Sequence, residues 1–156
     1  MSWFRRRVRG PLEAQLRQGL SPEGLAWSVA VGLALGIFPV LGTTTILCLL
    51  AGQLFRLNQP TLQLANYLAY PLQLVLILPF IRLGERLFGG PLLRLSLPDL
   101  LAAFKAAPMA TLAEHWTRTW HACAVWALLA PATAALLSLS LRPLLASVAR
   151  RLAKEP

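Results

Sequence analysis

The sequence predicts an all-α fold of integral membrane helices, two of them broken at a proline and so either kinked or re-entrant, together with amphipathic surface helices. Composition is the first reason, since hydrophobic residues make up 56% of the 156 residues and charged residues only 13%. The second is charge placement, because no charged residue occurs between Glu23 and Arg56 or between Arg56 and Arg82. The third is a proline inside each of these two stretches, Pro39 and Pro71.

The uncharged stretches are long enough to cross a bilayer. A hydrocarbon core of about 30 Å needs about 20 helical residues, and a charge at its centre costs about 3 kcal/mol. A third stretch, between Arg118 and Arg142, meets the same length and carries only His121 as a titratable group. A soluble bundle with three such helices would lack enough polar sequence to cover them.

Composition also excludes several classes of protein. The apolar content, with a mean hydropathy of +0.59, excludes a disordered chain. Cys48 and Cys123 both lie inside apolar stretches, which argues against a disulfide scaffold.

The net charge of +9 comes from basic residues that flank the apolar stretches. We therefore expect anionic lipid headgroups as partners, and no nucleic acid. The expected lipid contacts are Arg5, Arg6, Arg7, Arg9, Arg150 and Arg151.

Four segments follow along the chain. Residues 1–20 are expected to form a basic amphipathic surface segment, and residues 21–90 a membrane core with two proline-broken segments. Residues 91–118 are expected to form an interfacial connector, and residues 119–156 a C-terminal membrane helix with a basic tail. These boundaries follow the changes in charge and hydropathy.

The first apolar segment is predicted to form two half-helices, about 25–38 and 43–55. Ser21-Pro22-Glu23 is a typical helix start, because serine caps free N–H groups and proline at the first position leaves no donor unpaired. Pro39 interrupts the helical hydrogen bonds, and Gly42 permits a positive φ. Each half would be about 20 Å long, too short to span alone.

The second apolar segment is expected to begin with Asn58 or Gln59 as its cap. Asn66, Tyr70, Pro71 and Gln73 lie in its middle. We expect Pro71 to start a second half-helix opposite the first, with the amides of Asn66 and Gln73 as neutral polar groups.

The connector and the C-terminal region are predicted to be helical. Ser96-Leu97-Pro98-Asp99 resembles a helix start, followed by an amphipathic helix at the membrane surface. The third apolar stretch, residues 119–141, contains Pro131, and the tail after Arg142 is again amphipathic.

Lysine and arginine placement favours a cytoplasmic N-terminus but leaves the number of crossings open. Three plain crossings place ten of the fifteen basic residues inside, and a re-entrant first segment followed by two crossings gives the same division. Two hairpins and one crossing place eleven basic residues on one side of the membrane and four on the other, and three hairpins place all fifteen on one side.

The breaks are the candidate functional positions. In a bilayer, irregular backbone is tolerated only where it is buried in protein or lines a polar cavity, and half-helix N-termini attract anionic groups. One hypothesis is a ligand or permeation site at these positions, and the other is that the groups satisfy one another. The candidate residues are Pro39, Gly42, Thr43, Thr44, Thr45, Asn66, Tyr70, Pro71 and Gln73.

Catalytic patterns are sparse, so the sequence does not favour an enzyme. His115 and His121 are six positions apart, and no Cys, Asp or Glu completes a metal site with them. Glu114 beside His115 is the one acid–base pair in the connector, and these histidines are interpreted as interfacial groups beside Trp116 and Trp120. No phosphate-binding glycine loop is present. We expect no cofactor and no metal.

An ordered series of short motifs runs through the first two apolar segments. These motifs are Ser21-Pro22, Leu25-Ala26, Ala30-x-Gly32-x-x-x-Gly36-x-x-Pro39-x-x-Gly42, Arg56-x-Asn58-x-Pro60, Asn66, Pro71 and Arg82-Leu83-Gly84. In this series the chain resembles the uncharacterised bacterial membrane proteins grouped as the family of domain of unknown function 2062. In many of these proteins an asparagine directly precedes the second proline, whereas this chain has Tyr70 there. The resemblance implies an integral membrane protein and brings no established reaction.

Together these observations predict a multi-pass protein of the bacterial inner membrane that binds or passes a small solute or lipid at its broken half-helices. One such subunit encloses little volume, so we expect a homo-oligomer or a partner in a membrane complex. The alternatives are an accessory subunit without a solute of its own and, third, an enzyme acting on lipid-linked substrates.

Overall fold

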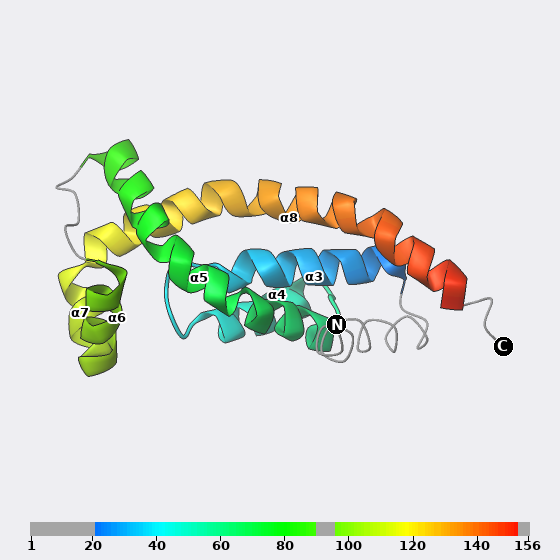
Figure 1. Cartoon of the computed structure of the whole chain (residues 1–156), viewed down its shortest axis with the longest axis horizontal. Coiled ribbons are helices and arrows are strands. Elements are labelled where there is room, and N and C mark those ends of the chain that lie inside the picture. The colour runs from blue at the N-terminus through cyan, green and yellow to red at the C-terminus, as the bar shows by residue number, and fades with distance from the viewer. Residues whose placement is uncertain (1–20, 90–95, 153–156) are drawn as a thin grey trace.

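The computed structural model describes residues 21–89 and 96–152, and within these ranges the chain forms six helices and no strand. The all-α fold class is thus confirmed. The predicted surface segment 1–20 lies outside the described residues. The helices are α3 (Pro22–Gly36), α4 (Thr44–Leu54), α5 (Gln59–Phe88), α6 (Leu97–Ala106), α7 (Pro108–Glu114) and α8 (Trp116–Leu152) (Figure 1).

Helix starts agree with the capping residues expected from the sequence. The Ser21 side chain accepts a hydrogen bond from the Gly24 N–H at the start of α3, and Asn58 does the same for Thr61 at the start of α5. Ser96 and Asp99 form a reciprocal capping box at the start of α6. The half-helix boundaries 22–36 and 44–54 confirm the two predicted halves of the first segment.

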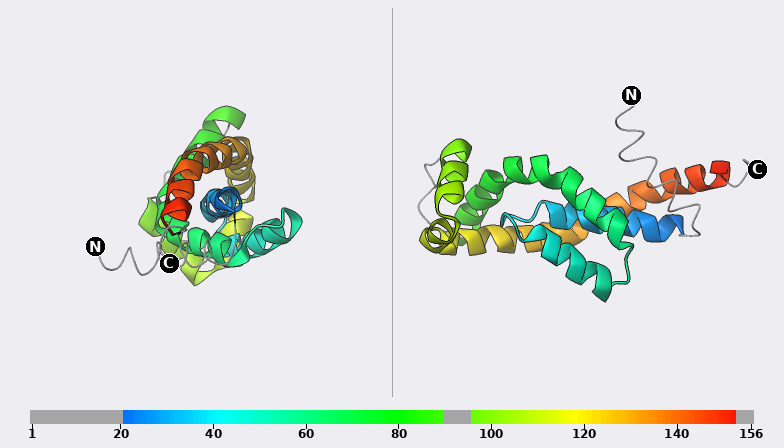
Figure 2. Two further views of the ribbon diagram at one scale, coloured as in Figure 1. Left: turned by 90° about the vertical axis from the view of Figure 1, so that its right-hand side faces the viewer. Right: turned by 90° about the horizontal axis from the view of Figure 1, so that it is seen from below.

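The structure corrects one prediction about the helix breaks. Pro71 does not start a new half-helix, because α5 continues as a single helix through both Pro71 and Pro79 and bends into an arc instead (Figure 2, right). Likewise α8 runs without interruption through Pro131 and Pro143, so the amphipathic residues after Arg142 continue the same helix. A proline removes one helical hydrogen bond, which bends a helix but need not end it.

The segment α3–α4 is a hairpin. The connector after α4 returns to the beginning of α3, where the Asn58 N–H donates to Ser28 Oγ at 2.9 Å. α4 therefore runs back beside α3 rather than continuing its direction (Figure 2, right). The turn of this hairpin, residues 37–43, lies against α6, since Pro39 and Leu41 line one small cavity with Leu100.

Helix α3 is the centre of the molecule. It packs against α4, α5 and α8, which surround it when the molecule is viewed end-on (Figure 2, left). α8 runs antiparallel to α3, because Leu145 near its C-terminus packs on Leu25 and Ala26. α6 and α7 lie at the opposite end, where α5 ends and α8 begins (Figure 1).

Small residues allow α3 and α5 to approach closely. Gly32 and Gly36 of α3 are buried against Ala65 and Ala69 of α5. A Cβ added to Gly36 would lie 2.6 Å from the Ala69 Cβ and 3.0 Å from the Asn66 carbonyl oxygen. Such a contact is the small-residue packing typical of helices in apolar surroundings.

We predict that Gly36→Ala lowers the free energy of unfolding by about 1–3 kcal/mol, because the new methyl group meets backbone and a Cβ that cannot move aside. Thermal unfolding of the detergent-solubilised protein, followed by circular dichroism, measures this change. Gly24→Ala in the first turn of the same helix is the matched control, since its Cβ would meet only the Ser21 hydroxyl, at 3.1 Å. An equal loss in both variants would contradict close α3–α5 packing as the cause.

Candidate functional site

The candidate site begins at the break between α3 and α4. Pro39 is buried in the turn, and Gly42 has a φ of 82°, a conformation that favours glycine. Thr43 Oγ1 donates to the Val40 carbonyl at 2.9 Å, so this hydroxyl closes the turn and does not cap α4. Thr44 is buried directly after it. Proline and glycine together thus reverse the chain.

Side chains of the two long helices satisfy the carbonyl groups at the end of α3. The Trp126 indole N–H of α8 donates to the Ala34 carbonyl at 2.9 Å. Gln73 of α5, only 1% exposed, donates from Nε2 to the Phe38 carbonyl at 2.7 Å. The Phe38 ring also meets the Trp126 ring edge to face, with centroids 4.8 Å apart. The Ala34 and Phe38 carbonyls at the break are therefore hydrogen-bonded within the protein.

Amide side chains of α5 fasten the returning helix α4 in the same way. Gln59 Nε2 donates to the Leu49 carbonyl at 2.8 Å, and Gln63 Nε2 donates to the Thr45 carbonyl at 3.2 Å. The buried Asn66 then donates from Nδ2 to Gln63 Oε1 at 3.3 Å. A row of amides on one face of α5 thus binds the hairpin.

The structure brings together most, but not all, of the residues singled out from the sequence. Asn66 and Gln73 lie on the buried face of α5 toward the hairpin. Tyr70 and Pro71 are exposed on the outer face of α5, with Tyr70 53% exposed, and take no part in the break. The expected lipid contact Arg150 is exposed near the end of α8. Arg5, Arg6, Arg7 and Arg9, and the side chain of Arg151, lie outside the described residues.

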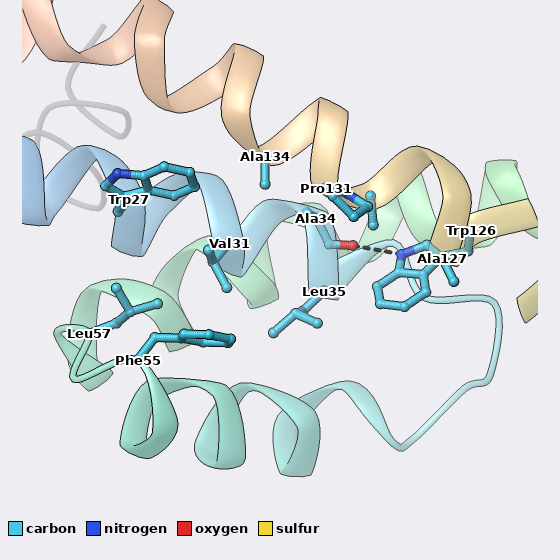
Figure 3. Close-up of a pocket in the computed structure, with 11 residues that line it drawn as sticks. Trp27, Val31, Ala34, Leu35, Phe55, Leu57, Trp126, Ala127, Pro131 and Ala134 are labelled. Atoms are coloured by element: carbon cyan, nitrogen blue, oxygen red, sulfur yellow. Dashed lines mark hydrogen bonds between the residues drawn. The ribbon is translucent and has the colours of Figure 1, made fainter. Parts of the chain in front are cut away.

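An apolar groove of about 610 Å³ lies beside the hairpin. Trp27, Val31 and Leu35 of α3 form one wall, and Phe55 and Leu57 at the end of α4 form another (Figure 3). The third wall is α8, which contributes small side chains (Ala127, Ala130, Pro131 and Ala134) and Trp126. The groove is not predicted from the sequence. Two tryptophans within apolar stretches were the available signal, since a buried indole N–H needs a hydrogen-bond partner and so indicates a contact with another helix.

A second cavity, of about 320 Å³, lies at the opposite end, between the end of α5 and the start of α8. Its lining includes Glu85, whose side chain is 1% exposed and binds Arg118 with 2.9 Å between Oε1 and Nε. Glu114, His115 and His121 also line it, so the acid–base pair of the connector belongs to a larger polar cluster. Within the described ranges no three His, Cys, Asp or Glu residues are placed to hold a metal ion.

Comparison with known proteins identifies the family. A family model described as "Uncharacterized protein conserved in bacteria (DUF2062)" matches residues 5–151. The chain belongs to the DUF2062 family. The match spans the hairpin, both long helices and the connector, so the whole site lies within the family domain. No curated protein and no solved structure matches this DUF2062 chain.

We predict that Gln73→Met destabilises this DUF2062 protein by about 1–3 kcal/mol, because methionine has a similar shape but leaves the Phe38 carbonyl without a donor. Leu72→Met, on the exposed face of the same helix, is the control and should change the free energy of unfolding by less than about 0.5 kcal/mol. Denaturation in mixed detergent micelles measures both. Indistinguishable variants would show that Gln73 does not support the break.

Proposed function

We propose that this protein is a lipid-binding integral membrane protein of the bacterial inner membrane, with two crossing helices and one re-entrant hairpin. α5 and α8 are each long and apolar enough to cross a bilayer. Only 39% of the most apolar window of α5 and 28% of that of α8 are buried inside the protein. A core helix of a soluble protein would be mostly buried, so the exposed apolar surface favours contact with lipid.

The level of the hairpin turn supports the re-entrant arrangement. Trp120 and Arg142 on α8 are separated by about 33 Å at 1.5 Å per residue, close to the thickness of a hydrocarbon core. Trp126 donates to the end of α3. Measured along the α8 axis at 1.5 Å per residue, it lies about 24 Å from Arg142 and about 9 Å from Trp120. The hairpin thus reverses within the apolar layer, beyond its middle, and α6 covers its turn.

Basic residues support an orientation with both termini in the cytoplasm. In this topology the N-terminal segment, the Arg56 connector and the chain from Arg142 onward share one side and carry ten Lys and Arg residues. The region between α5 and α8, together with the adjoining helix ends, carries the other five. Cytoplasmic loops are enriched in Lys and Arg, so the side with ten is assigned to the cytoplasm.

We predict that positions 56 and 150 face the cytoplasm and that position 102 faces the periplasm. Arg56→Cys, Ala102→Cys and Arg150→Cys, each in a background with Cys48 and Cys123 replaced by alanine, would be labelled with a membrane-impermeant maleimide in intact cells and in inverted vesicles. All three positions are exposed. Labelling of position 56 from the periplasm would support three plain crossings and contradict the hairpin.

The groove beside the hairpin is the observation on which lipid binding rests. Its lining side chains are apolar except for the indole N–H groups of Trp27 and Trp126, and the Trp126 indole already donates to the Ala34 carbonyl. The amides of Gln73 and Gln63 are also engaged with backbone carbonyls. A polar solute would find few free groups here, whereas an acyl chain needs none. The volume of about 610 Å³ falls within the range of about 300–1,000 Å³ typical of ligand pockets.

A cationic group lies at one end of the groove. The guanidinium of Arg142 lies 6.0 Å from the centroid of the Trp27 ring, and Trp27 also lines the groove. Arg142 Nη2 pairs with the exposed carboxylate of Glu23 at 2.9 Å, and its buried Nε has no hydrogen-bond partner among the described residues. A lipid phosphate beside Arg142 would leave its acyl chain next to Trp27, which supports an anionic phospholipid as the ligand.

We predict that Ala127→Phe, which fills the groove from α8, reduces acyl-chain binding at least about fivefold. The measurement uses a phosphatidylglycerol with a diazirine on its acyl chain, irradiated with the protein in nanodiscs, and mass spectrometry of the cross-linked α3 peptides. Ala132→Phe is the control, because Ala132 is exposed on the same helix and does not line the groove. Equal cross-linking of α3 in both variants would contradict the proposal.

A further inference from the structure

The polar cavity at the far end of the molecule is separate from the groove and has a different character. Its polar lining residues are Glu85, Glu114, His115, Thr117, Arg118 and His121. They come from the end of α5, the junction of α7 with α8 and the first turns of α8. None of them lines the apolar groove. Groups of both charge signs therefore face one space of about 320 Å³.

Arg118 is the central cation of this cavity. Its Nε donates to the buried Glu85 carboxylate at 2.9 Å, and its Nη1 lies 3.3 Å from His115 Nδ1. These two contacts use two of the five N–H groups of a guanidinium, so donors remain on a side chain that is 28% exposed. His121 lies beside it in the lining, half-buried and stacked on Phe88 at 4.9 Å. Together these residues can bind an anionic group.

The charges are ordered from the interior outward. Glu85 is buried, Arg118 is partly buried, and Glu114 is an exposed carboxylate of the same lining. An anion at Arg118 would therefore share the cavity with a more exposed carboxylate, which a cationic group of the same ligand can approach. A second purely anionic group would meet Glu114 unfavourably, so a ligand with an inner anion and an outer cation complements the cavity best.

We propose that this cavity binds the headgroup of an aminophospholipid, with the phosphate at Arg118 and His121 and the primary ammonium at Glu114. The level of the cavity agrees with a headgroup, because the exposed side chains of Trp116 and Trp120 flank it on α8, and exposed tryptophans are typical of the membrane interface. In such a lipid the phosphate adjoins the hydrocarbon and the ammonium is outermost, which matches the increase in exposure from Arg118 to Glu114.

Selectivity for the amine follows from hydrogen bonding. A primary ammonium donates N–H groups to a carboxylate, whereas the quaternary ammonium of a choline headgroup has none to donate. Hydrogen bonds between charged partners are about twice as strong as neutral ones. The full-length protein should therefore bind phosphatidylethanolamine about tenfold more tightly than phosphatidylcholine with the same acyl chains. Phosphatidylglycerol lacks the ammonium, and its binding to the Ala127→Phe variant, in which the groove is filled, measures the contribution of the phosphate alone.

Native mass spectrometry of the detergent-solubilised protein with these three lipids tests the proposal. We expect Glu114→Gln to abolish the preference for phosphatidylethanolamine over phosphatidylcholine without weakening phosphatidylglycerol. Glu23→Gln is the matched control, because Glu23 is an exposed carboxylate that pairs with an arginine at the other end and should leave the preference intact. Equal binding of the two lipids to the wild type, or a preference retained by Glu114→Gln, overturns the proposal.

Two further arms identify the source of the ligand and the site. Soluble O-phosphoethanolamine carries the same charges, so binding as tight as that of the lipid would assign the cavity to a free zwitterion and overturn the lipid headgroup. Failure to compete at concentrations that are tenfold above the lipid supports the headgroup. Ala127→Phe should keep the preference, since it alters only the groove. Loss of the preference in that variant would place the ethanolamine lipid in the groove instead.

Discussion

The interruption of a helix in apolar surroundings leaves carbonyl groups that have no water to bind, and this constraint organises the molecule. At the end of α3, Ala34 and Phe38 would each present such a carbonyl. Trp126 of α8 satisfies the first and Gln73 of α5 the second, so each long helix supplies one donor to the carbonyl groups at the end of α3. Backbone irregularity at this position is tolerated because the surrounding protein supplies what solvent would otherwise supply.

Close packing makes those two hydrogen bonds geometrically possible. The glycines of α3 bring its backbone against the alanines of α5, which places the amide side chains of α5 within reach of the hairpin. On the other side, Ala34 packs against Ala130 and Ala134 of α8, and the larger Trp27 and Trp126 adjoin this contact. Small residues at a helix crossing flanked by bulky ones leave unfilled space beside the crossing, and this space is the apolar groove. The same packing that supports the break therefore creates the cavity.

Much of the fold followed from local signals in the sequence, and the exceptions have a common physical cause. The caps at Ser21, Asn58 and Ser96 and the break at Pro39 are decided by residues within a few positions. Pro71 was misjudged because a proline alone only bends a helix, whereas Pro39 is followed by Gly42, which turns the chain with a positive φ. Pairs such as Glu85 with Arg118, separated by 33 positions, depend on which helix faces meet and leave no local pattern. For that reason the amides of the break were predicted, but the groove and the polar cavity were not.

The distance in sequence between the two carbonyls and their donors has a consequence for the synthesis of the protein. Gln73 follows Phe38 by 35 residues, whereas Trp126 follows Ala34 by 92 residues. At about 5–20 residues per second, a ribosome completes Trp126 about 5–20 s after Ala34. During that interval the Ala34 carbonyl lacks its side-chain donor, so the end of α3 cannot reach its final hydrogen bonding before α8 is synthesised. Folding during synthesis is thus ordered, because α8, the last helix to be made, supplies the hydrogen-bond donor for the end of α3.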